Sequence, residues 1–409
     1  MRGSIFLFAT DLHDEGPEVV LENVQGRGGL GGVTLACAYH HARDLFPHNP
    51  VRKVRFLEGG TVFFRPDPRR YERLRIKPQV SRLAAEIDVL GDLIARAGRR
   101  GLAVRAWTVY LHNTTLGSRY PECAPRNVFG DPYITNLCPA NPDVRAYARA
   151  LSADLARHGV ESIVAESLGW GGFDHGYHHE RAFIPLSPVA RFLLGLCFCE
   201  HCMRAIGAAG VAVERVRGFV RAELERVLDG EPTALPEGEA VREELAALAG
   251  GELGPFLAAR ETIVTGLVAE VREAVEATGA TRFVAMDMAG AAKGYATGEP
   301  TGAPAPASAW REGLDPARVG KAAHGLAAIG YARDPARLRL DLDAYRALLP
   351  ARRTLSVALR PMPPDCDAAA NLAAKVAVLR GGDVTWADFY HYGFMRLHAL
   401  DWIREALAG

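Results

Sequence analysis

The sequence has no surplus of charge of either sign, because 48 lysine and arginine residues balance 48 aspartate and glutamate residues. A chain without net charge has no overall field that would attract nucleic acid or an anionic membrane surface. We therefore expect no nucleic-acid partner. Lysine is also scarce, since only five of the 48 cationic residues are lysines, but this bias says nothing about activity.

The N-terminus lacks a long apolar run. The run from Ile5 to Ala9 stops at Thr10, which makes it too short for the apolar region of a signal peptide and far too short for a membrane span. We therefore expect a cytoplasmic protein with no membrane partner. Self-association into a homo-oligomer is left open by the sequence.

Cysteine is sparse and odd in number, with seven residues in 409. Without a secretion signal, metal ligation or buried thiols are expected rather than a disulfide framework. Hydrophobic residues make up 49% and charged residues 23% of the chain. These values are globular averages, and they exclude disorder, collagen and coiled coil as descriptions of the whole chain.

Short β-branched runs alternate with longer helical patterns along the whole chain, which is typical of repeated βα units around a parallel sheet. Helical patterns include Gln79 to Ala97, Asp143 to Arg157, Ala368 to Arg380 and Leu397 to Leu407. No glycine-rich phosphate fingerprint follows the first strand, so a (β/α)₈ TIM barrel is favoured over a doubly wound sheet. The eight predicted strands are Ile5 to Asp11, Val33 to Tyr39, Ala103 to Leu111, Ser162 to Ser167, Arg282 to Met288, Leu326 to Tyr331, Thr354 to Arg360 and Val384 to Tyr390.

We expect residues 1–409 to form a single barrel domain. Two of its segments are additions to a minimal barrel. Residues 54–66 are predicted to form an extra hairpin turned by Gly59 and Gly60. Residues 203–278 are predicted to be a helical insertion within the barrel. Loops of unusual composition, residues 169–179 and 289–309, follow the fourth and fifth strands, on the side where barrels carry their active sites.

A cluster of cysteines predicts a metal site. Cys197, Cys199 and Cys202 have the spacing C-x-C-x₂-C, and three such thiolates need a fourth ligand for a tetrahedral metal. We assign Cys138, which precedes Pro139, as that ligand and expect a structural Zn²⁺. Cys123 and His201 are reserve ligands.

The order of these motifs resembles the zinc-bearing β-galactosidases of glycoside hydrolase family 42. The matching residues are Leu-Cys-Pro-Ala-Asn-Pro at 137–142, a strand ending in Glu166 and Cys-Phe-Cys-Glu-His-Cys at 197–202. The resemblance covers about residues 103–205. It implies a (β/α)₈ barrel, a structural zinc beside the active site and hydrolysis of glycosides. It also implies that Glu166 is the catalytic acid/base, although Ala165 stands where the family has an asparagine that binds sugar.

Glycoside hydrolysis usually needs a second carboxylate. The family places its nucleophile on strand seven, but that strand ends here in Leu359 and Arg360 without an acid. Asp287, near the end of strand five, is our first candidate for the partner of Glu166. Asp388, near the end of strand eight, is the second candidate, with a salt bridge to Arg360 as its structural alternative.

Histidine and aromatic residues follow several strands and are expected to gather on one rim, where they would stack on a sugar and bond its hydroxyl groups. The candidate substrate-binding residues are His40, His41, Trp107, His112, Asn113, Trp170, His175, His178, His179, Arg360, Trp386, Tyr390 and Tyr392.

The leading hypothesis is therefore a glycoside hydrolase-like enzyme that acts on a soluble sugar. A metal-dependent sugar isomerase or epimerase is the second hypothesis, in which Glu166, Asp287 and rim histidines would bind a catalytic metal. A carbohydrate-binding barrel that has lost its nucleophile is the third. Chelation should cost stability if the metal is structural, and activity at unchanged fold if it is catalytic.

Overall fold

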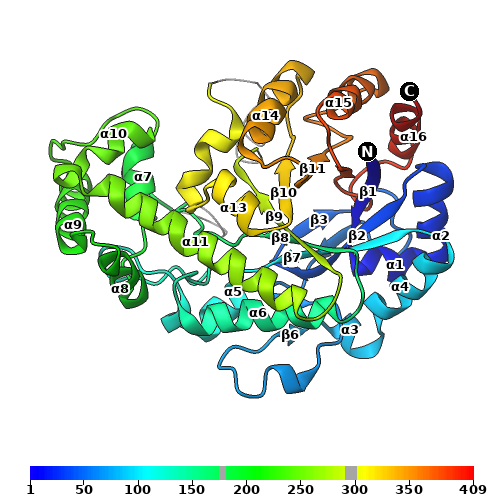
Figure 1. The fold of residues 1–409 in the computed structure, drawn as a ribbon, viewed down its shortest axis with the longest axis horizontal. Helices are drawn as coiled ribbons and strands as arrows, with labels where there is room; N and C mark the ends of the chain where they lie inside the picture. The colour runs from blue at the N-terminus through cyan, green and yellow to red at the C-terminus, as the bar shows by residue number, and fades with distance from the viewer. Residues whose placement is uncertain (175–180, 291–301) are drawn as a thin grey trace.

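The computed structural model describes residues 1–174, 181–290 and 302–409 (Figure 1). Eight parallel strands form a closed barrel, because β1 pairs with both β2 and β12. The barrel strands are β1 (Arg2–Leu7), β2 (Gly32–Tyr39), β7 (Ala103–Val109), β8 (Ser162–Glu166), β9 (Arg282–Asp287), β10 (Gly325–Ile329), β11 (Thr354–Leu359) and β12 (Trp386–Phe389). The predicted (β/α)₈ TIM barrel is confirmed.

The strands are buried along nearly their whole length, as expected for a parallel sheet whose outer face is covered by helices. The first strand is an exception to the predicted boundaries, because it ends at Leu7 and helix α1 (Ala9–Glu15) follows. The side chain of Asp11 accepts a hydrogen bond of 2.8 Å from the backbone N–H of Phe8. This cap starts a helix where the sequence pattern predicts strand.

Helices surround the barrel, and proline and polar caps fix where several of them begin. Helix α6 (Pro142–Ala156) has proline at its first position, and the side chain of Asn141 accepts hydrogen bonds from two backbone N–H groups of the first turn. The other outer helices include α2 (Pro17–Glu22), α3 (Arg82–Glu86), α4 (Val89–Arg99), α13 (Pro316–Ala322), α14 (Pro335–Leu348), α15 (Ala369–Gly381) and α16 (Ala399–Ala408). None of the described helices combines the length and apolar character needed to cross a membrane.

The predicted hairpin 54–66 is wrong in its pairing. Strand β4 (Val54–Phe56) pairs with β3 (Arg43–Leu45) in a separate two-stranded sheet. Strand β5 (Thr61–Val62) instead pairs antiparallel with the end of β2, and β6 (Gln79–Val80) lies beside it. Gly60 has φ +70° and its N–H donates to the carbonyl of Tyr39, so the glycine turn returns the chain to the barrel edge.

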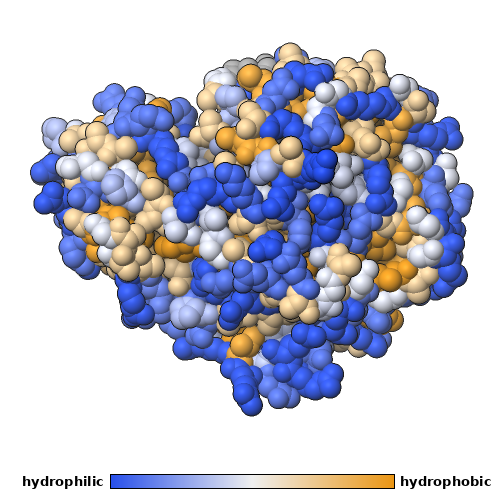
Figure 2. Space-filling model, viewed as in Figure 1, coloured by the Kyte–Doolittle hydropathy of each residue, from blue (hydrophilic) through white to orange (hydrophobic). Residues whose placement is uncertain are grey.

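The predicted insertion 203–278 contains two kinds of helix. The long helix α11 (Leu253–Glu276) packs against α6 and α13, which is the position of a barrel helix between β8 and β9. Helices α8 (Glu200–Ala208), α9 (Val213–Asp229) and α10 (Arg242–Ala246) lie to one side of the barrel (Figure 1). On the face seen in Figure 2, hydrophobic residues are interspersed among hydrophilic ones.

Candidate active site

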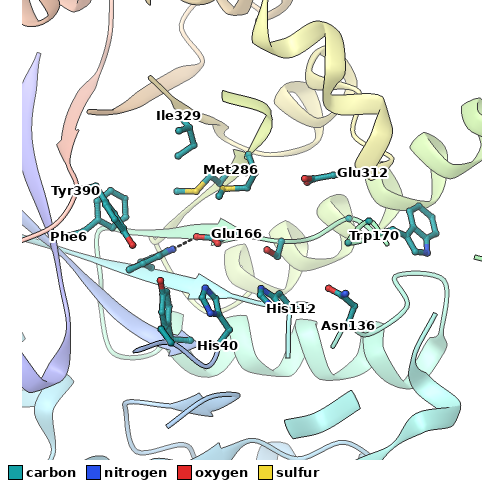
Figure 3. Close-up of a pocket in the computed structure, with 18 of the residues that line it drawn as sticks. Phe6, His40, His112, Asn136, Glu166, Trp170, Met286, Glu312, Ile329 and Tyr390 are labelled. Carbon is teal, nitrogen blue, oxygen red and sulfur yellow. Dashed lines mark hydrogen bonds between the residues drawn. The ribbon is translucent and has the colours of Figure 1, made fainter. Parts of the chain in front are cut away.

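A pocket of about 380 Å³ lies at the carboxyl ends of the barrel strands (Figure 3). Its wall combines aromatic rings with a few polar groups, which is the usual character of a small-molecule site. The aromatic lining residues are Phe6, Tyr39, Trp107, Trp170, Tyr331 and Tyr390. The polar lining residues include His40, Asp44, His112, Asn136, Glu166, Ser167 and Glu312.

Glu166 is the last residue of β8, and its side chain enters the pocket (Figure 3). The side chain is buried, and the indole Nε1–H of Trp107 donates a hydrogen bond of 2.6 Å to its Oε2 atom. Burial raises the pKa of Glu166 to about 7, and the hydrogen bond from Trp107 opposes this rise. A carboxyl group with such a pKa can exchange protons near neutral pH.

Glu312 is a second carboxylate of the pocket lining, and it is not among the residues predicted from the sequence. It ends the 3-10 helix η5 (Ala305–Glu312), just before Gly313 in a left-handed conformation. Burial raises the pKa of Glu312 to about 8, the negative charges of Asp287 and Glu166 add to the rise, and Arg260 opposes it. Glu312 lies just past the unusual tract 289–309 on the carboxyl side of β9, and that position is the only sequence signal that could have identified it.

The backbone of Glu312 is held tightly against the loop that follows β8. Its carbonyl oxygen accepts a hydrogen bond of 3.0 Å from the N–H of Trp170. A Cβ atom at Gly169 would lie only 2.2 Å from the same oxygen. Glycine at position 169 therefore allows the close approach that brings Glu312 and Trp170 into one pocket wall.

The two aspartates proposed as partners of Glu166 are both outside the described pocket lining. Asp287 is buried and accepts hydrogen bonds from the hydroxyl of Tyr345 at 2.7 Å and from the N–H of Ala289 at 3.0 Å. Burial raises its pKa to about 6. Both of its oxygens are therefore engaged by neighbouring groups, and of the two acids on this side of β9 it is Glu312 that lines the pocket.

Asp388 lies inside the barrel, level with Ser4 of β1. It forms a buried ion pair with Arg105, which also donates to the hydroxyl of Ser356 at 3.1 Å. The structural alternative considered for Asp388, a salt bridge to Arg360, names the wrong partner. Arg360 instead pairs with Asp365, with contacts of 2.6 and 2.8 Å.

Five of the candidate substrate-binding residues line the pocket, namely His40, Trp107, His112, Trp170 and Tyr390. The rings of His40 and His112 are stacked, with centroids 4.5 Å apart and an interplanar angle of 21°. These five residues therefore share one pocket, and their role in binding a substrate stays a prediction. The remaining candidates His175, His178 and His179 lie outside the described residues.

Five further candidates lie in the described residues but do not line the pocket. The side chain of Asn113 caps α5 (Thr114–Arg119), and the hydroxyl of Tyr392 donates to Glu15 at 2.7 Å. Trp386 begins β12 at the opposite end of the barrel, under the guanidinium groups of Arg2 and Arg105. The prediction that Trp386 lies on the rim is wrong, because the eighth strand starts at this residue. His41 and Arg360 are likewise absent from the lining.

The four predicted metal ligands converge. The Sγ atom of Cys138 lies 3.9, 3.6 and 3.4 Å from those of Cys197, Cys199 and Cys202, and all four side chains are buried. Tetrahedral Zn–S bonds of about 2.3 Å would place the sulfurs roughly 3.8 Å apart, and the three measured separations lie close to this value.

The reserve ligands are not part of this cysteine centre, which we define as Cys138, Cys197, Cys199 and Cys202. Cys123 contributes only its carbonyl, which accepts from the N–H of Cys138 at 2.8 Å. Across residues 1–174, 181–290 and 302–409, the centre is the only group of three or more possible metal ligands whose donor atoms converge. The metal-dependent isomerase hypothesis therefore has no ligand set in the described part of the pocket.

A scan of protein-family models and a search of curated proteins found no match to this chain. Solved structures do resemble it. The β-galactosidase of the psychrophilic Marinomonas ef1 has a TM-score of 0.55 and 10% identity, covering 100% of this chain and 59% of that one. α-L-Fucosidase isoenzyme 2 of Paenibacillus thiaminolyticus has a TM-score of 0.54 and 12% identity, covering 100% and 49%.

The catalytic domain of β-amylase from Paenibacillus polymyxa has a TM-score of 0.54 and 11% identity, and here the coverage is 98% of this chain and 94% of that one. The chain thus spans only about half to three-fifths of the first two proteins, but nearly all of the third domain. At such low identity the likeness shows the fold alone. The chain shares its (β/α)₈ barrel architecture with these three proteins.

Proposed function

We propose that the chain is a glycoside hydrolase that cleaves an O-glycosidic bond of a small, soluble carbohydrate. One observation carries this proposal: Glu166 and Glu312, both with raised pKa, line one aromatic pocket at the carboxyl end of a (β/α)₈ barrel. Hydrolysis of a glycoside needs two carboxyl groups, one that donates a proton to the leaving oxygen and one that acts as nucleophile or base. Fold likeness to glycosidases agrees with this assignment.

The two glutamates divide these roles through their surroundings. The N–H of Trp107 stabilises the charged form of Glu166, whereas negative neighbours disfavour the charged form of Glu312. When two acids compete for one proton, it resides on the group whose charge is less well stabilised. Glu312 is therefore the proton donor and Glu166 the carboxylate, the reverse of the role that the family resemblance implies for Glu166.

The remaining lining residues supply recognition. Trp107, Tyr390 and Tyr331 offer flat apolar faces against which a sugar ring can stack. Stacked His40 and His112, together with Asn136, offer donors and acceptors for hydroxyl groups. This combination suits an uncharged sugar.

We further propose that the cysteine centre holds Zn²⁺ as a structural ion. Four thiolates with this mutual spacing suit a closed tetrahedral zinc site, which contributes folding energy and leaves no position open for substrate. This zinc site is the feature that supports kinship with family 42.

Turnover of a panel of p-nitrophenyl glycosides, including galactosides, glucosides and fucosides, tests the proposed activity. Glu166→Gln should lower kcat by about 10² to 10⁴-fold on the best of these substrates, and Glu312→Gln should lose as much on an alkyl glycoside of the same sugar. Glu223→Gln is the control, because it changes a buried carboxyl group on α9, outside the pocket lining, and should retain most activity at equal folded fraction. The proposal fails if no glycoside is hydrolysed, or if both glutamine variants match the parent.

Leaving groups separate the two roles. An activated aryl leaving group departs without a proton, so Glu312→Gln should lose much less rate on such substrates than on alkyl glycosides. Glu166→Gln should lose rate on both. The opposite pattern would return the acid role to Glu166.

A further inference from the structure

Arg260 packs against the wall of the pocket from the protein interior. It belongs to α11, and only 2% of its surface is exposed. Its guanidinium carbon lies 4.7 Å from the centroid of the Trp170 ring, and Trp170 lines the pocket. Its Nη2 atom donates a hydrogen bond of 3.1 Å to the carbonyl of Arg311, the residue before Glu312.

Two donor atoms of this buried cation have no partner. The Nε and Nη1 atoms of Arg260 are inaccessible to solvent and make no hydrogen bond to the described residues. No carboxylate of the described chain forms an ion pair with Arg260, since its neighbour Glu261 is bonded to Arg242. An unpaired buried charge is costly, so the fold must supply a compensating negative charge in some other form.

The cysteine centre is placed to supply that charge. Helix α11 packs beside this centre, because the ring of Phe198, between Cys197 and Cys199, lies 5.5 Å from the ring of Phe256, one turn before Arg260. Burial lowers the pKa of Arg260 to about 10, while Cys202 and Cys197 act to raise it. Four thiolates around one divalent cation leave a net charge of two negative units. The anionic centre and the unpaired cation are thus buried near each other in a protein interior of low dielectric.

We propose that Arg260 is a positioning residue. Its positive charge balances the negative charge of the metal–thiolate centre, and its contacts hold the proton donor Glu312 in position. The path has two branches. One runs through the Arg311 carbonyl to the adjacent Glu312. The other runs through Trp170, whose ring lies under the guanidinium and whose backbone N–H donates to the carbonyl of Glu312. The inference rests on the proposed zinc and on the proposed hydrolase function.

The same cation acts on Glu312 through space. The charged groups that affect the pKa of Glu312 are Asp287 and Glu166, which raise it, and Arg260, which lowers it. Loss of the Arg260 charge should therefore raise the pKa of Glu312 further. Because a proton donor must be protonated to work, the alkaline limb of the kcat/KM profile should move to higher pH.

Zinc release tests the first part of the inference. Zinc-loaded parent, Arg260→Gln, Arg260→Lys and Arg272→Met proteins are mixed with a chromogenic chelator, and the release rate is recorded. Arg272→Met is the matched control, because it removes an arginine of the same helix that is bonded to Glu276 at 2.8 and 2.7 Å. Partners beyond the ligand shell typically change metal affinity by 10- to 100-fold, so Arg260→Gln should release zinc faster by about this factor.

Lysine keeps the charge but cannot reproduce the planar fork, so Arg260→Lys should release zinc at an intermediate rate. The alkaline limb should shift in Arg260→Gln and stay in place in Arg260→Lys, which a purely structural role would not produce. Parent-like zinc release in Arg260→Gln would overturn the proposal, as would a protein that binds no zinc. If the glutamine variant does not fold, the lysine variant decides, because a parent-like rate there also overturns it.

Zinc release requires no substrate. If the parent hydrolyses no glycoside, the proposed function fails, while the release rates still decide whether Arg260 supports the cysteine centre.

Discussion

The two pocket glutamates differ in how their neighbours affect the stability of the charged carboxylate. Glu166 accepts a hydrogen bond from Trp107, whereas the carboxyl group of Glu312 faces the charges of Asp287 and Glu166. Both are glutamates beside the same cavity, yet the contacts favour opposite protonation states. This difference in surroundings gives the pair its proposed division of labour.

The raised pKa of Glu312 makes a prediction for stability. A carboxyl group whose pKa is raised on folding favours the folded state while protonated, and this contribution is lost as pH rises through the folded pKa of about 8. Glutamine stays uncharged at every pH. Glu312→Gln should therefore have a higher Tm than the parent at pH 9, and the difference should shrink toward pH 5.

Thermal unfolding of both proteins between pH 5 and 9 measures this difference. Glu225→Gln is the control, because Glu225 lies on α9, away from the pocket, in an exposed i,i+4 pair with Arg221. A Tm difference for Glu312→Gln that does not change with pH would show that Glu312 carries no folding-linked shift in pKa.

The sequence places residues at the pocket where a side chain lies near the end of a strand. Glu166, His40 and Trp107 line the pocket because the strand ends of a barrel carry their residues to that face. Glu312 was not identified, because it ends a 3-10 turn between β9 and α13 and has no strand periodicity. Asp287 was chosen instead on strand position alone, and the bond to Tyr345 that occupies it arises from a distant helix.

At the scale of elements, the loop after β8 is what joins Glu166 to Glu312. Gly169 lets this loop touch the carbonyl of Glu312, and a methyl group there would require the backbone to move. Gly169→Ala should therefore displace Glu312 and lower kcat/KM by about 10- to 100-fold, the scale expected for a misplacement of about 1 Å.

Gly172→Ala is the matched control, since Gly172 also lines the pocket and an added Cβ there meets nothing within 4 Å. Kinetics of the two alanine variants at equal folded fraction make the comparison. Equal activity of both variants would mean that the contact between Gly169 and Glu312 does not position the acid.

The cysteine centre joins two loops and the start of α8. Cys138 precedes α6, while Cys199 caps α8 and Cys202 lies in its first turn. Cys199→Ser should remove one thiolate, weaken zinc retention and lower Tm. Metal analysis and thermal unfolding measure both effects. Cys37→Ser, at a buried thiol outside the centre, should keep zinc at the parental stoichiometry.

Unfolding of zinc-stripped protein completes this test. The Tm difference between Cys199→Ser and the parent should largely vanish once both have been stripped, because the parent then loses the same stabilisation. An undiminished difference would assign the cost to packing of the sulfur instead of metal binding.

Elements were predicted best where hydrophobic pattern and caps agree. Helix α6 was expected at 143–157 and runs from Pro142 to Ala156, because Asn141 and Pro142 define its start. The hairpin failed because β-strands shorter than four residues carry too little pattern to specify a partner. Thr61 and Val62 find theirs on β2, a choice made by the tertiary structure of the barrel edge.

At the scale of the whole molecule, the barrel could be predicted because its strands are regularly spaced and apolar. The side-chain contacts inside the barrel could not be predicted, because a layer of polar residues crosses its interior. Arg105 of β7 donates to Ser162 of β8 at 3.0 Å and to Ser356 of β11 at 3.1 Å, and it pairs with Asp388 of β12. A pattern of alternating residues says which side chains point inward, but not which of them pair across the barrel.

This layer makes the last prediction. Asp388 and Arg105 are both almost fully buried, so removing the charge of one leaves the other uncompensated inside the barrel. Breaking a buried ion pair in this way typically costs about 3 to 5 kcal/mol of unfolding free energy. Asp388→Asn should lose stability on this scale in urea unfolding, whereas Asp343→Asn, at an exposed position of α14, should stay within about 0.5 kcal/mol.

A catalytic role for Asp388 predicts a different pattern. If Asp388 acts only in the fold, the folded fraction of Asp388→Asn should hydrolyse its substrate nearly as fast as the parent, because Arg105 and Asp388 lie beneath the pocket and outside its described lining. If Asp388→Asn keeps the unfolding free energy of the parent but loses turnover, Asp388 is a catalytic carboxylate, as the sequence first indicated. Lost stability with retained turnover would show that the contacts of Arg105 stabilise the barrel by connecting β7, β8, β11 and β12 below the pocket.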